Sequence, residues 1–418
     1  MAQASSSRII AAGAIGNVLE WYDFAVYGYF AAAIGRAFFP SEDKVAQVLA
    51  AFGIFAVGFL MRPVGGALIG YIGDRLGRRS ALTFSVAAMA IPTFLVGVLP
   101  GYDTLGLAAP ILLTLLRMIQ GLSVGGEYTT SIVFMIEHAK AGSRGMVGAV
   151  GCCGAAIGIL AGSATGAVLA SVMSEAALES WGWRIPFVLG LVVGLAGFFL
   201  RRGIHAEEKA RKAVRSPLIE TFRNHRPLLL RLAALSVFNS VGFYVMFVYI
   251  VSWLQLADGI APARALGINT ISMALLPPVM VGTAWLSDRV GRRPVVLAAT
   301  AFAFVAAWPL FWLLHSANDA VVLLGQLGFV LAVGTFIGCQ PAIMVEAVPA
   351  EVRCTAIAVG YNVTLGVVGG LSPLVATWLV ARTANDYSPA FMIMAAAAVS
   401  FLALLSFKET FRASLNPA

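Results

Sequence analysis

Twelve apolar runs, each about 18 residues or longer, follow one another along this 418-residue chain. A run of that length crosses the roughly 30 Å hydrocarbon core of a bilayer as a helix. Helices are expected because backbone polar groups in lipid must be satisfied within each segment. The runs therefore predict an all-α membrane protein with twelve transmembrane helices, at 9–36, 47–72, 80–100, 105–137, 145–173, 184–201, 228–256, 265–287, 294–315, 320–347, 354–381 and 388–407.

The charge distribution supports this topology. The chain is 60% hydrophobic and 11% charged, with a mean hydropathy of +0.88, outside the usage of soluble globular proteins. With the N-terminus placed in the cytoplasm, 21 of the 28 Lys and Arg residues fall on the cytoplasmic side. The net charge of +8 therefore indicates a multi-pass membrane protein with both termini in the cytoplasm, and not a nucleic-acid partner.

One long polar stretch divides six runs from six. It predicts an N-terminal six-helix bundle at 1–201, a cytoplasmic linker at 202–227 and a C-terminal six-helix bundle at 228–418. The segment "GYIGDRLGRR" at 70–79 recurs as "AWLSDRVGRR" at 284–293. This internal repeat indicates two pseudo-symmetric bundles with a similar cytoplasmic face.

A second repeat places an acid and a base seven residues apart, first Glu137 and Arg144, then Glu346 and Arg353. We hypothesise two latches of the cytoplasmic mouth, Asp74 with the first pair and Asp288 with the second. The alternative is that these charges only anchor the topology among anionic lipid head groups. The predicted gate residues are Asp74, Arg75, Arg78, Glu137, Arg144, Asp288, Arg289, Arg292, Glu346 and Arg353.

The motifs carry a family resemblance that covers the whole chain. The two Asp-Arg-x-Gly-Arg-Arg loops and "RMIQGLSVGGEY" resemble signature segments of the major facilitator superfamily. Within it, "GNVLEWYDFAVYGY", "GFLMRPVGG", "GGEYTTS" and "WGWRIPF" resemble the metabolite:proton symporter family, whose members carry citrate, 2-oxoglutarate, shikimate, and proline or betaine. The resemblance implies the major facilitator fold, a bacterial inner (plasma) membrane location and a functional monomer.

Five charged residues of the first half lie inside predicted spans and away from the span ends: Glu20, Asp23, Arg62, Arg117 and Glu127. Each charge at mid-bilayer costs on the order of 2.5 to 3.5 kcal/mol, so it needs a partner or a purpose. The three acids outnumber the two bases by one. One acid therefore has no basic counterpart and is expected to bind a proton or attract a cation. We expect proton coupling at Asp23, with Glu127 and Glu20 as the other candidates.

Structural alternatives exist for each of these charges. Asp23 and Arg62 form a possible ion pair that clamps spans 1 and 2. Glu20 lies one helical turn from Asp23 and is a candidate for a network with Arg117 or for positioning Asp23. Arg117 has a planar fork suited to a carboxylate, or it braces two helices.

Neutral polar side chains in the second half suit hydrogen bonds to a small solute. Together with the first-half candidates they give the predicted substrate-binding residues Arg117, Arg62, Tyr27, Gln120, Tyr128, Asn239, Tyr244 and Asn362.

Two local patterns bear on helix packing. Gly154, Gly158 and Gly162 recur every fourth residue and predict close helix approach. Pro277 and Pro278 are expected to break the hydrogen-bond ladder of their helix.

These features predict a secondary transporter, not an enzyme, that takes up a small organic carboxylate, such as a di- or tricarboxylate, together with protons by alternating access. Two buried arginines favour an anion. The chain ends about ten residues after the last run, which leaves no room for a long heptad-patterned tail. By resemblance, such a tail is expected in the osmosensory branch of the family. The alternative substrate is a zwitterionic osmolyte, proline or betaine. A channel or an intramembrane enzyme is a remote alternative, and no cofactor or metal is expected.

Overall fold

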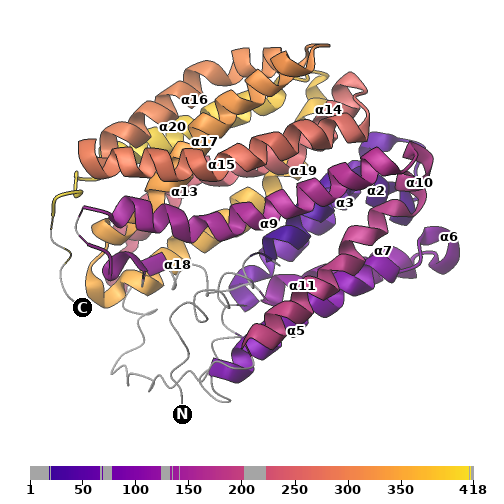
Figure 1. Ribbon diagram of the computed structural model, residues 1–418, viewed down its shortest axis with the longest axis horizontal. Coiled ribbons are helices and arrows are strands. Elements are labelled where there is room, and N and C mark those ends of the chain that lie inside the picture. Colours follow the sequence, from indigo (N-terminus) through magenta and orange to yellow (C-terminus); the bar gives the residue numbers. More distant parts are fainter. Residues whose placement is uncertain are drawn as a thin grey trace. The chain divides into compact units, whose positions relative to one another are not determined.

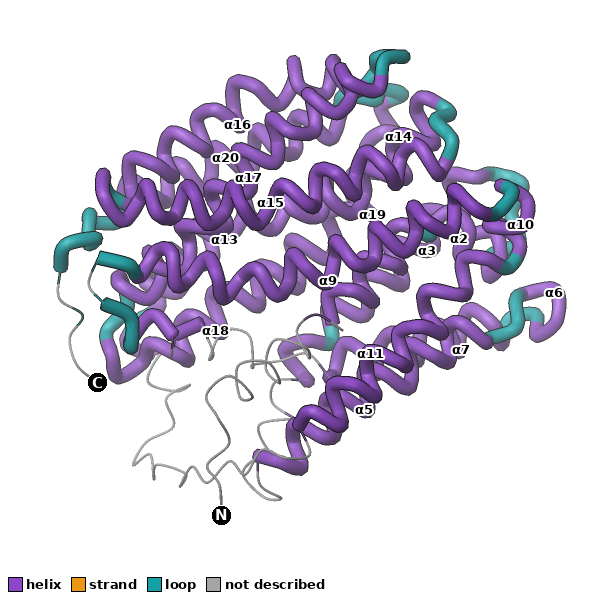
Figure 2. Tube along the Cα trace, viewed as in Figure 1, coloured by secondary structure: helices purple, strands orange, loops and turns teal. Residues whose placement is uncertain are grey.

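The structure is a computed structural model that describes residues 18, 20–65, 68, 78–123, 132–133, 135–140, 142–201, 223–413 and 415. Every regular element within these residues is a helix (Figures 1 and 2). The predicted all-α class is confirmed for this part of the chain.

Contacts group the chain into two compact units, which are described separately. Unit 1 comprises Met1–Glu127, Gly154–Lys212 and Val251–Thr270; unit 2 comprises Tyr128–Cys153, Ala213–Ile250 and Ile271–Ala418. The division of the sequence at 201 and 228 stays a prediction, and residues 202–222 of the expected linker lie outside the described residues.

Unit 1 packs its helices in a short sequence of neighbours. Helix α2 packs on α3, α3 on α7, α7 on α5, and α5 on α11. Its elements are α2 (Ala31–Phe38), α3 (Lys44–Leu60), α5 (Arg78–Val98), α6 (Tyr102–Leu105), α7 (Ala108–Ser123), α10 (Glu175–Ser180), η1 (Gly182–Arg184) and α11 (Ile185–Arg201). Three more helices contribute residues to both units: α9 (Arg144–Val172), α14 (Ile250–Asp258) and α15 (Pro262–Val290).

Unit 2 is built around α13 and α16. Helix α13 packs on α18 and α20, and α16 packs on α17 and α20. Its elements are α13 (Arg226–Tyr244), the π-helical turn η2 (Val245–Tyr249), α16 (Arg292–Leu314), α17 (Asp319–Ala347), η3 (Ala350–Val352), α18 (Arg353–Thr364), the π-helical turn η4 (Leu365–Gly369), α19 (Gly370–Thr383) and α20 (Ser388–Leu405).

Helix lengths agree with membrane crossing. Eight described helices are long and apolar enough to span a bilayer: Lys44–Gly65, Arg144–Val172, Arg226–Asp258, Pro262–Val290, Arg292–Leu314, Asp319–Ala347, Arg353–Thr383 and Ser388–Leu405. Three apolar helices are shorter: Phe84–Val98, Ala108–Ser123 and Gly182–Val192. In the first predicted span, residues 20–29 are helical and α2 follows. The total of twelve spans and the cytoplasmic termini stay predictions.

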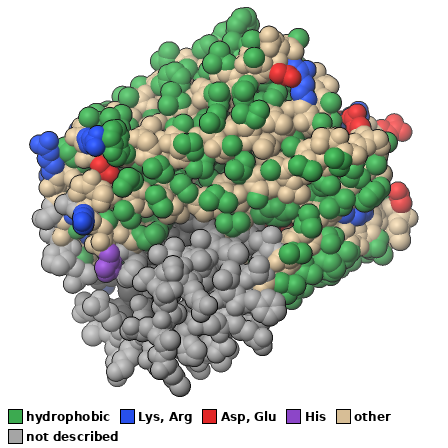
Figure 3. All heavy atoms as spheres, in the orientation of Figure 1, with side chains coloured by type: hydrophobic (Ala, Val, Ile, Leu, Met, Phe, Trp, Pro, Cys, Tyr) green, Lys and Arg blue, Asp and Glu red, His purple; other side chains and the backbone are tan. Residues whose placement is uncertain are grey.

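The helices also carry apolar side chains outward. Val305 is 74% exposed and Leu402 is 65% exposed. Figure 3 shows one face of the molecule, on which hydrophobic side chains far outnumber charged ones. Such a surface suits lipid and would be an aggregation liability in water.

Local sequence signals set several helix ends. The Asp43 carboxylate accepts a hydrogen bond from Val45 N at 2.8 Å and so caps α3. Gly291 has φ +111°, a backbone conformation that favours glycine, in the turn before α16. Pro277 and Pro278 lie inside α15, which continues through both. Neither proline has an N–H to donate, so the hydrogen-bond ladder is interrupted at these residues although the helix is not. Membrane helices tolerate proline where neighbouring groups satisfy the freed carbonyls.

Glycine brings backbones together within unit 1. Cβ atoms added at Gly158 and Gly162 would meet the segment that holds Trp21 and Ala25, as the glycine stripe predicts. A closer seam joins α3 to α7, where a Cβ at Gly121 would overlap the carbonyl oxygen of Gly58.

This seam gives a stability prediction. We expect Gly121→Ala to destabilise the protein by about 1 to 3 kcal/mol, because the methyl group forces the two backbones apart. Gly53→Ala is the matched control, since no heavy atom lies within 4 Å of its added Cβ and alanine favours helix. Thermal unfolding in detergent measures both, and equal melting temperatures for the two variants would contradict the tight seam.

Candidate functional site: two buried charge networks

Among the described residues of unit 1, the most buried charge is Asp23, in helical residues 20–29, with no exposed surface. Its Oδ2 accepts from Arg117 Nη1 at 2.5 Å, and its Oδ1 accepts from Gln120 Nε2 at 2.8 Å. Thr93 Oγ1 donates to the same Oδ1 at 2.8 Å. Arg117 and Gln120 lie one turn apart on α7, and Thr93 lies on α5, so three helical segments meet at one carboxylate. Asp23, Thr93, Arg117 and Gln120 are called the Asp23 cluster below.

Arg117 uses only part of its fork in this cluster. Nη1 donates to Asp23 and also to Gln120 Oε1 at 2.7 Å. Nε and Nη2 find no hydrogen-bond acceptor among the described side chains, although Arg117 is only 1% exposed. The guanidinium carbon instead lies 3.8 Å from the centroid of the Tyr27 ring, a cation–π contact. The Tyr27 hydroxyl donates to the Ala51 carbonyl at 3.0 Å. Arg117 therefore keeps one polar edge for a further acceptor.

A second ion pair lies beside this cluster. Arg62 Nη2 lies 2.6 Å from Glu20 Oε1, with the two side chains 5% and 16% exposed. The Arg62 guanidinium also lies 5.0 Å from the Phe59 ring centroid and 5.6 Å from that of Phe24. The carboxylate neutralises this buried cation, and the aromatic faces stabilise it further.

The pairing differs from both alternatives left open by the sequence. Asp23 pairs with Arg117 and not with Arg62, and Glu20 pairs with Arg62 and not with Arg117. The reason is geometric, since Arg117 and Gln120 share a face of α7 and reach the same carboxylate. Both arginines are thereby matched by an acid. The surplus acid of the sequence count is then Glu127, which lies outside the described residues together with Tyr128.

Unit 2 holds a neutral polar group of side chains. Asn239 Nδ2 donates to Gln340 Oε1 at 3.0 Å and to Tyr361 Oη at 3.4 Å, and Gln340 Nε2 donates to Ser236 Oγ at 2.9 Å. A cavity of about 20 Å³, room for one water, is lined by Asn239, Gln340 and Tyr361 among apolar neighbours. Neither of the other second-half candidates, the buried Tyr244 and the half-buried Asn362, lines it.

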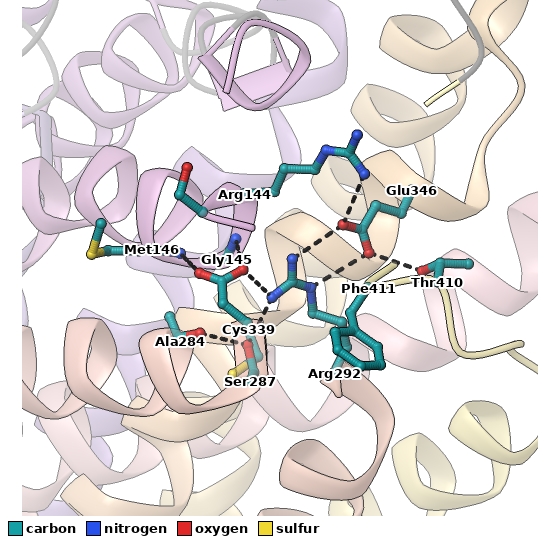
Figure 4. A network of polar contacts seen from close by, with 12 residues as sticks. Arg144, Gly145, Met146, Ala284, Ser287, Arg292, Cys339, Glu346, Thr410 and Phe411 are labelled. Atoms are coloured by element: carbon teal, nitrogen blue, oxygen red, sulfur yellow. Dashed lines mark hydrogen bonds and ion pairs between the residues drawn. The ribbon is translucent and has the colours of Figure 1, made fainter. Parts of the chain in front are cut away.

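Unit 2 also contains a charge network on α9, α15, α16 and α17, which we call the gate network. The Asp288 carboxylate accepts from Gly145 N and Met146 N, both at 2.9 Å, and from Arg292 Nη1 at 2.5 Å. Arg292 reaches on to Glu346, with Nη2–Oε1 at 3.2 Å and Nε–Oε2 at 3.4 Å (Figure 4). Arg144 Nη1 lies 3.7 Å from Glu346 Oε1. These four charged side chains are almost fully buried.

The gate network corrects the predicted latches. Arg144 pairs with Glu346, and Arg353 Nη1 pairs with Glu137 Oε1 at 2.5 Å. Each arginine of the repeated pair therefore takes the acid of the other repeat, where the sequence hypothesis grouped each with its own. The sequence repeat allows this exchange because each repeat supplies one acid and one arginine at equivalent positions.

The other predicted gate residues take no described part in this network. Arg289 is exposed and lies over the Trp285 ring at 3.5 Å. Asp74 and Arg75 lie outside the described residues, and Arg78 is described only as the first residue of α5.

The sequence does not predict several members of these networks. Thr93 follows Pro92 within an apolar run, and a lone hydroxyl at that depth was the available signal. Gln340 and Ser236 gave the same kind of weak signal. Among the described residues, no three His, Cys, Asp or Glu side chains gather as metal ligands.

A double-mutant cycle tests the pairing. We expect Asp23→Asn and Arg117→Gln to be coupled by about 0.5 to 3 kcal/mol in thermal stability, because breaking one pair leaves a single uncompensated charge. Asp23→Asn with Arg62→Gln should be nearly additive. Coupling of Asp23 to Arg62 in place of Arg117 would show that the pairing is wrong.

Comparison with known proteins identifies the family of this chain. The sequence matches the Major Facilitator Superfamily over residues 13–373. It is 34% identical to the glycine betaine/proline/ectoine/pipecolic acid transporter of Dickeya dadantii, over 98% of this chain and 85% of that protein. It is 33% identical to the proline/betaine transporter of Escherichia coli K12 over the same shares.

Solved structures agree on the fold. The crystal structure of a D-xylose-proton symporter superposes with a TM-score of 0.78 and 19% identity, over 99% of this chain and 100% of that one. The resemblance in the motifs is thus confirmed by the family match, the relatives and the fold. The chain belongs to the Major Facilitator Superfamily of membrane transporters.

Proposed function

We propose that this protein is a proton-coupled transporter of a zwitterionic osmolyte such as proline or betaine, working by alternating access in the bacterial inner membrane. The observation that carries the proposal is the Asp23–Arg117 pair, which is fully buried and leaves one edge of Arg117 unused. The relatives named above, described as proline and betaine transporters, support the same substrate class.

Charge balance argues for a zwitterion over a di- or tricarboxylate. The prediction of an anion rested on two buried arginines, but Glu20 and Asp23 already neutralise them. A substrate with two or three negative charges would therefore leave charge uncompensated in a dry interior. A zwitterion brings one carboxylate for Arg117 and its own cation, which aromatic rings such as Tyr27 and Phe24 stabilise.

The same geometry suggests how a proton is coupled to the substrate. When the substrate carboxylate engages Arg117, Asp23 loses its counter-charge. A carboxylate without a cation in a dry interior is stabilised by taking up a proton. Asp23 would then carry the proton while the substrate is bound and release it when the substrate leaves and the Asp23–Arg117 pair forms again. Glu127 remains the second candidate because the pairing leaves it as the surplus acid.

The gate network supplies the second half of the cycle. We place it at the cytoplasmic mouth, where the repeated basic loops lie in the predicted topology with twelve spans and both termini inside. The crossed pairs Arg144–Glu346 and Arg353–Glu137 join the two repeats and must break when that mouth opens. A functional monomer suffices for this cycle.

Uptake into proteoliposomes tests the substrate class. With an inward proton gradient, we expect labelled proline or glycine betaine to accumulate, and citrate and 2-oxoglutarate not to accumulate. A protonophore should abolish accumulation, and raising the external pH should lower it as the gradient falls. Gradient-driven accumulation of citrate without proline or betaine would overturn the proposal.

Variants of the Asp23 cluster test the coupling. We expect Asp23→Asn to lose gradient-driven accumulation but to keep substrate exchange across the membrane, because the amide cannot release a proton. Arg117→Lys should raise the apparent KM about tenfold or more, because lysine loses the planar fork. Asp103→Asn, at an exposed acid of α6, is the matched control. Intact accumulation in Asp23→Asn would remove Asp23 from the coupling step.

A further inference from the structure

The segment after α20 lies on the gate network. Helix α16 begins after Gly291, which supplies no side-chain cap to the first turn. The cap comes from Glu409, whose Oε1 accepts from Arg292 N at 3.1 Å and whose Oε2 accepts from Arg293 N at 2.9 Å. A carboxylate at a helix N-terminus satisfies free N–H groups and meets the positive end of the helix dipole.

Gly291 makes this approach possible. An added Cβ would lie 2.8 Å from Glu409 Oε2, and its φ of +111° already disfavours other residues. The same device occurs at the start of α9, where the Asp288 carboxylate accepts from Gly145 N and Met146 N. Two helices that start with arginine are thus both capped by a distant carboxylate.

The next residues of the segment bind the acids and bases of the gate network directly. Thr410 Oγ1 donates to Glu346 Oε2 at 2.8 Å (Figure 4). Arg144 Nη1 donates to the Ala413 carbonyl at 2.8 Å. Residues 408–413, which we call the strap, therefore contact Arg292, Glu346 and Arg144, three members of the network, through three different groups.

We infer that the strap is an intramolecular regulator of the gate, with Glu409 as a positioning residue that holds Arg292 in its fork to Glu346. This inference rests on the proposed gating role. Three strap contacts are made to members of the gate network, at Arg292, Glu346 and Arg144, so the strap stabilises the closed network over the open one. Release of the strap raises the open population without touching the Asp23 cluster.

A native thiol lies next to the network. Cys339 has no exposed surface and lies beside Ser287, within the electrostatic reach of Asp288 and Arg292 (Figure 4). In a protein with Cys152, Cys153 and Cys354 replaced by Ser, only Cys339 remains for alkylation. Its rate of reaction with N-ethylmaleimide follows the open population when opening and closing are faster than alkylation.

The experiment compares strap variants in that background. We expect Glu409→Ala to raise the Cys339 alkylation rate about fivefold, the factor that loss of one helix cap gives to a two-state equilibrium. Thr410→Val, which is nearly isosteric, should raise the rate by a smaller factor. Glu409→Gln keeps one acceptor oxygen and should retain most of the protection. Lys408→Gln, at the exposed neighbouring position, is the control and should leave the rate unchanged.

The outcomes separate this inference from the proposed substrate. Faster alkylation with no change in the apparent KM for proline or betaine supports a regulator of the gate. Unchanged alkylation in both Glu409→Ala and Thr410→Val overturns the inference, even if the protein transports proline. Faster alkylation in a protein that transports neither osmolyte would support the regulatory role of the strap and reject the proposed substrate class. A merely structural strap would lower the melting temperature and leave the alkylation rate of the folded protein unchanged.

Discussion

The cost of keeping charge out of water governs this structure. Asp23 and Arg117 have essentially no contact with solvent, and their attraction offsets the desolvation penalty only because amide and hydroxyl donors complete the carboxylate's shell. The pair fixes where α7, α5 and residues 20–29 meet. The pair also links substrate binding to protonation. A substrate carboxylate that binds Arg117 removes the counter-charge of Asp23, and this favours the protonated form of Asp23.

Much of the fold follows directly from the amino-acid order. Long apolar runs can only be helices in lipid, so α13 to α20 appear close to the predicted spans. The close approach at Gly158 also follows from the sequence, since it depends on one residue's lack of a side chain. The continuity of α15 through two prolines was not readable, because neighbouring segments decide whether freed carbonyls are satisfied.

Charge pairing was harder to predict than charge position. The sequence identified Glu20, Asp23, Arg62 and Arg117 as buried, but spacing along one helix cannot say which neighbour each side chain reaches. The crossed pairs of the gate network show the same limit. Repeats reveal that Glu137 and Glu346 are equivalent, and only the packed structure shows that they exchange partners. Counting arginines without their partners led to the anionic substrate, which the relatives do not favour.

The seam between α3 and α7 has a mechanical consequence. Carbonyl groups of Gly58 and Leu122 lie where Cβ atoms of Gly121 and Gly65 would have to be, so the two backbones touch with no side chain between them. Backbone in direct contact cannot slide without losing that fit. The two buried arginines thus lie on helices that are held rigidly together. Arg62 lies near the end of the α3 span, and Arg117 lies on α7. In any motion of the transporter the two cations travel together, and the adjustable partners are the acids and the cargo.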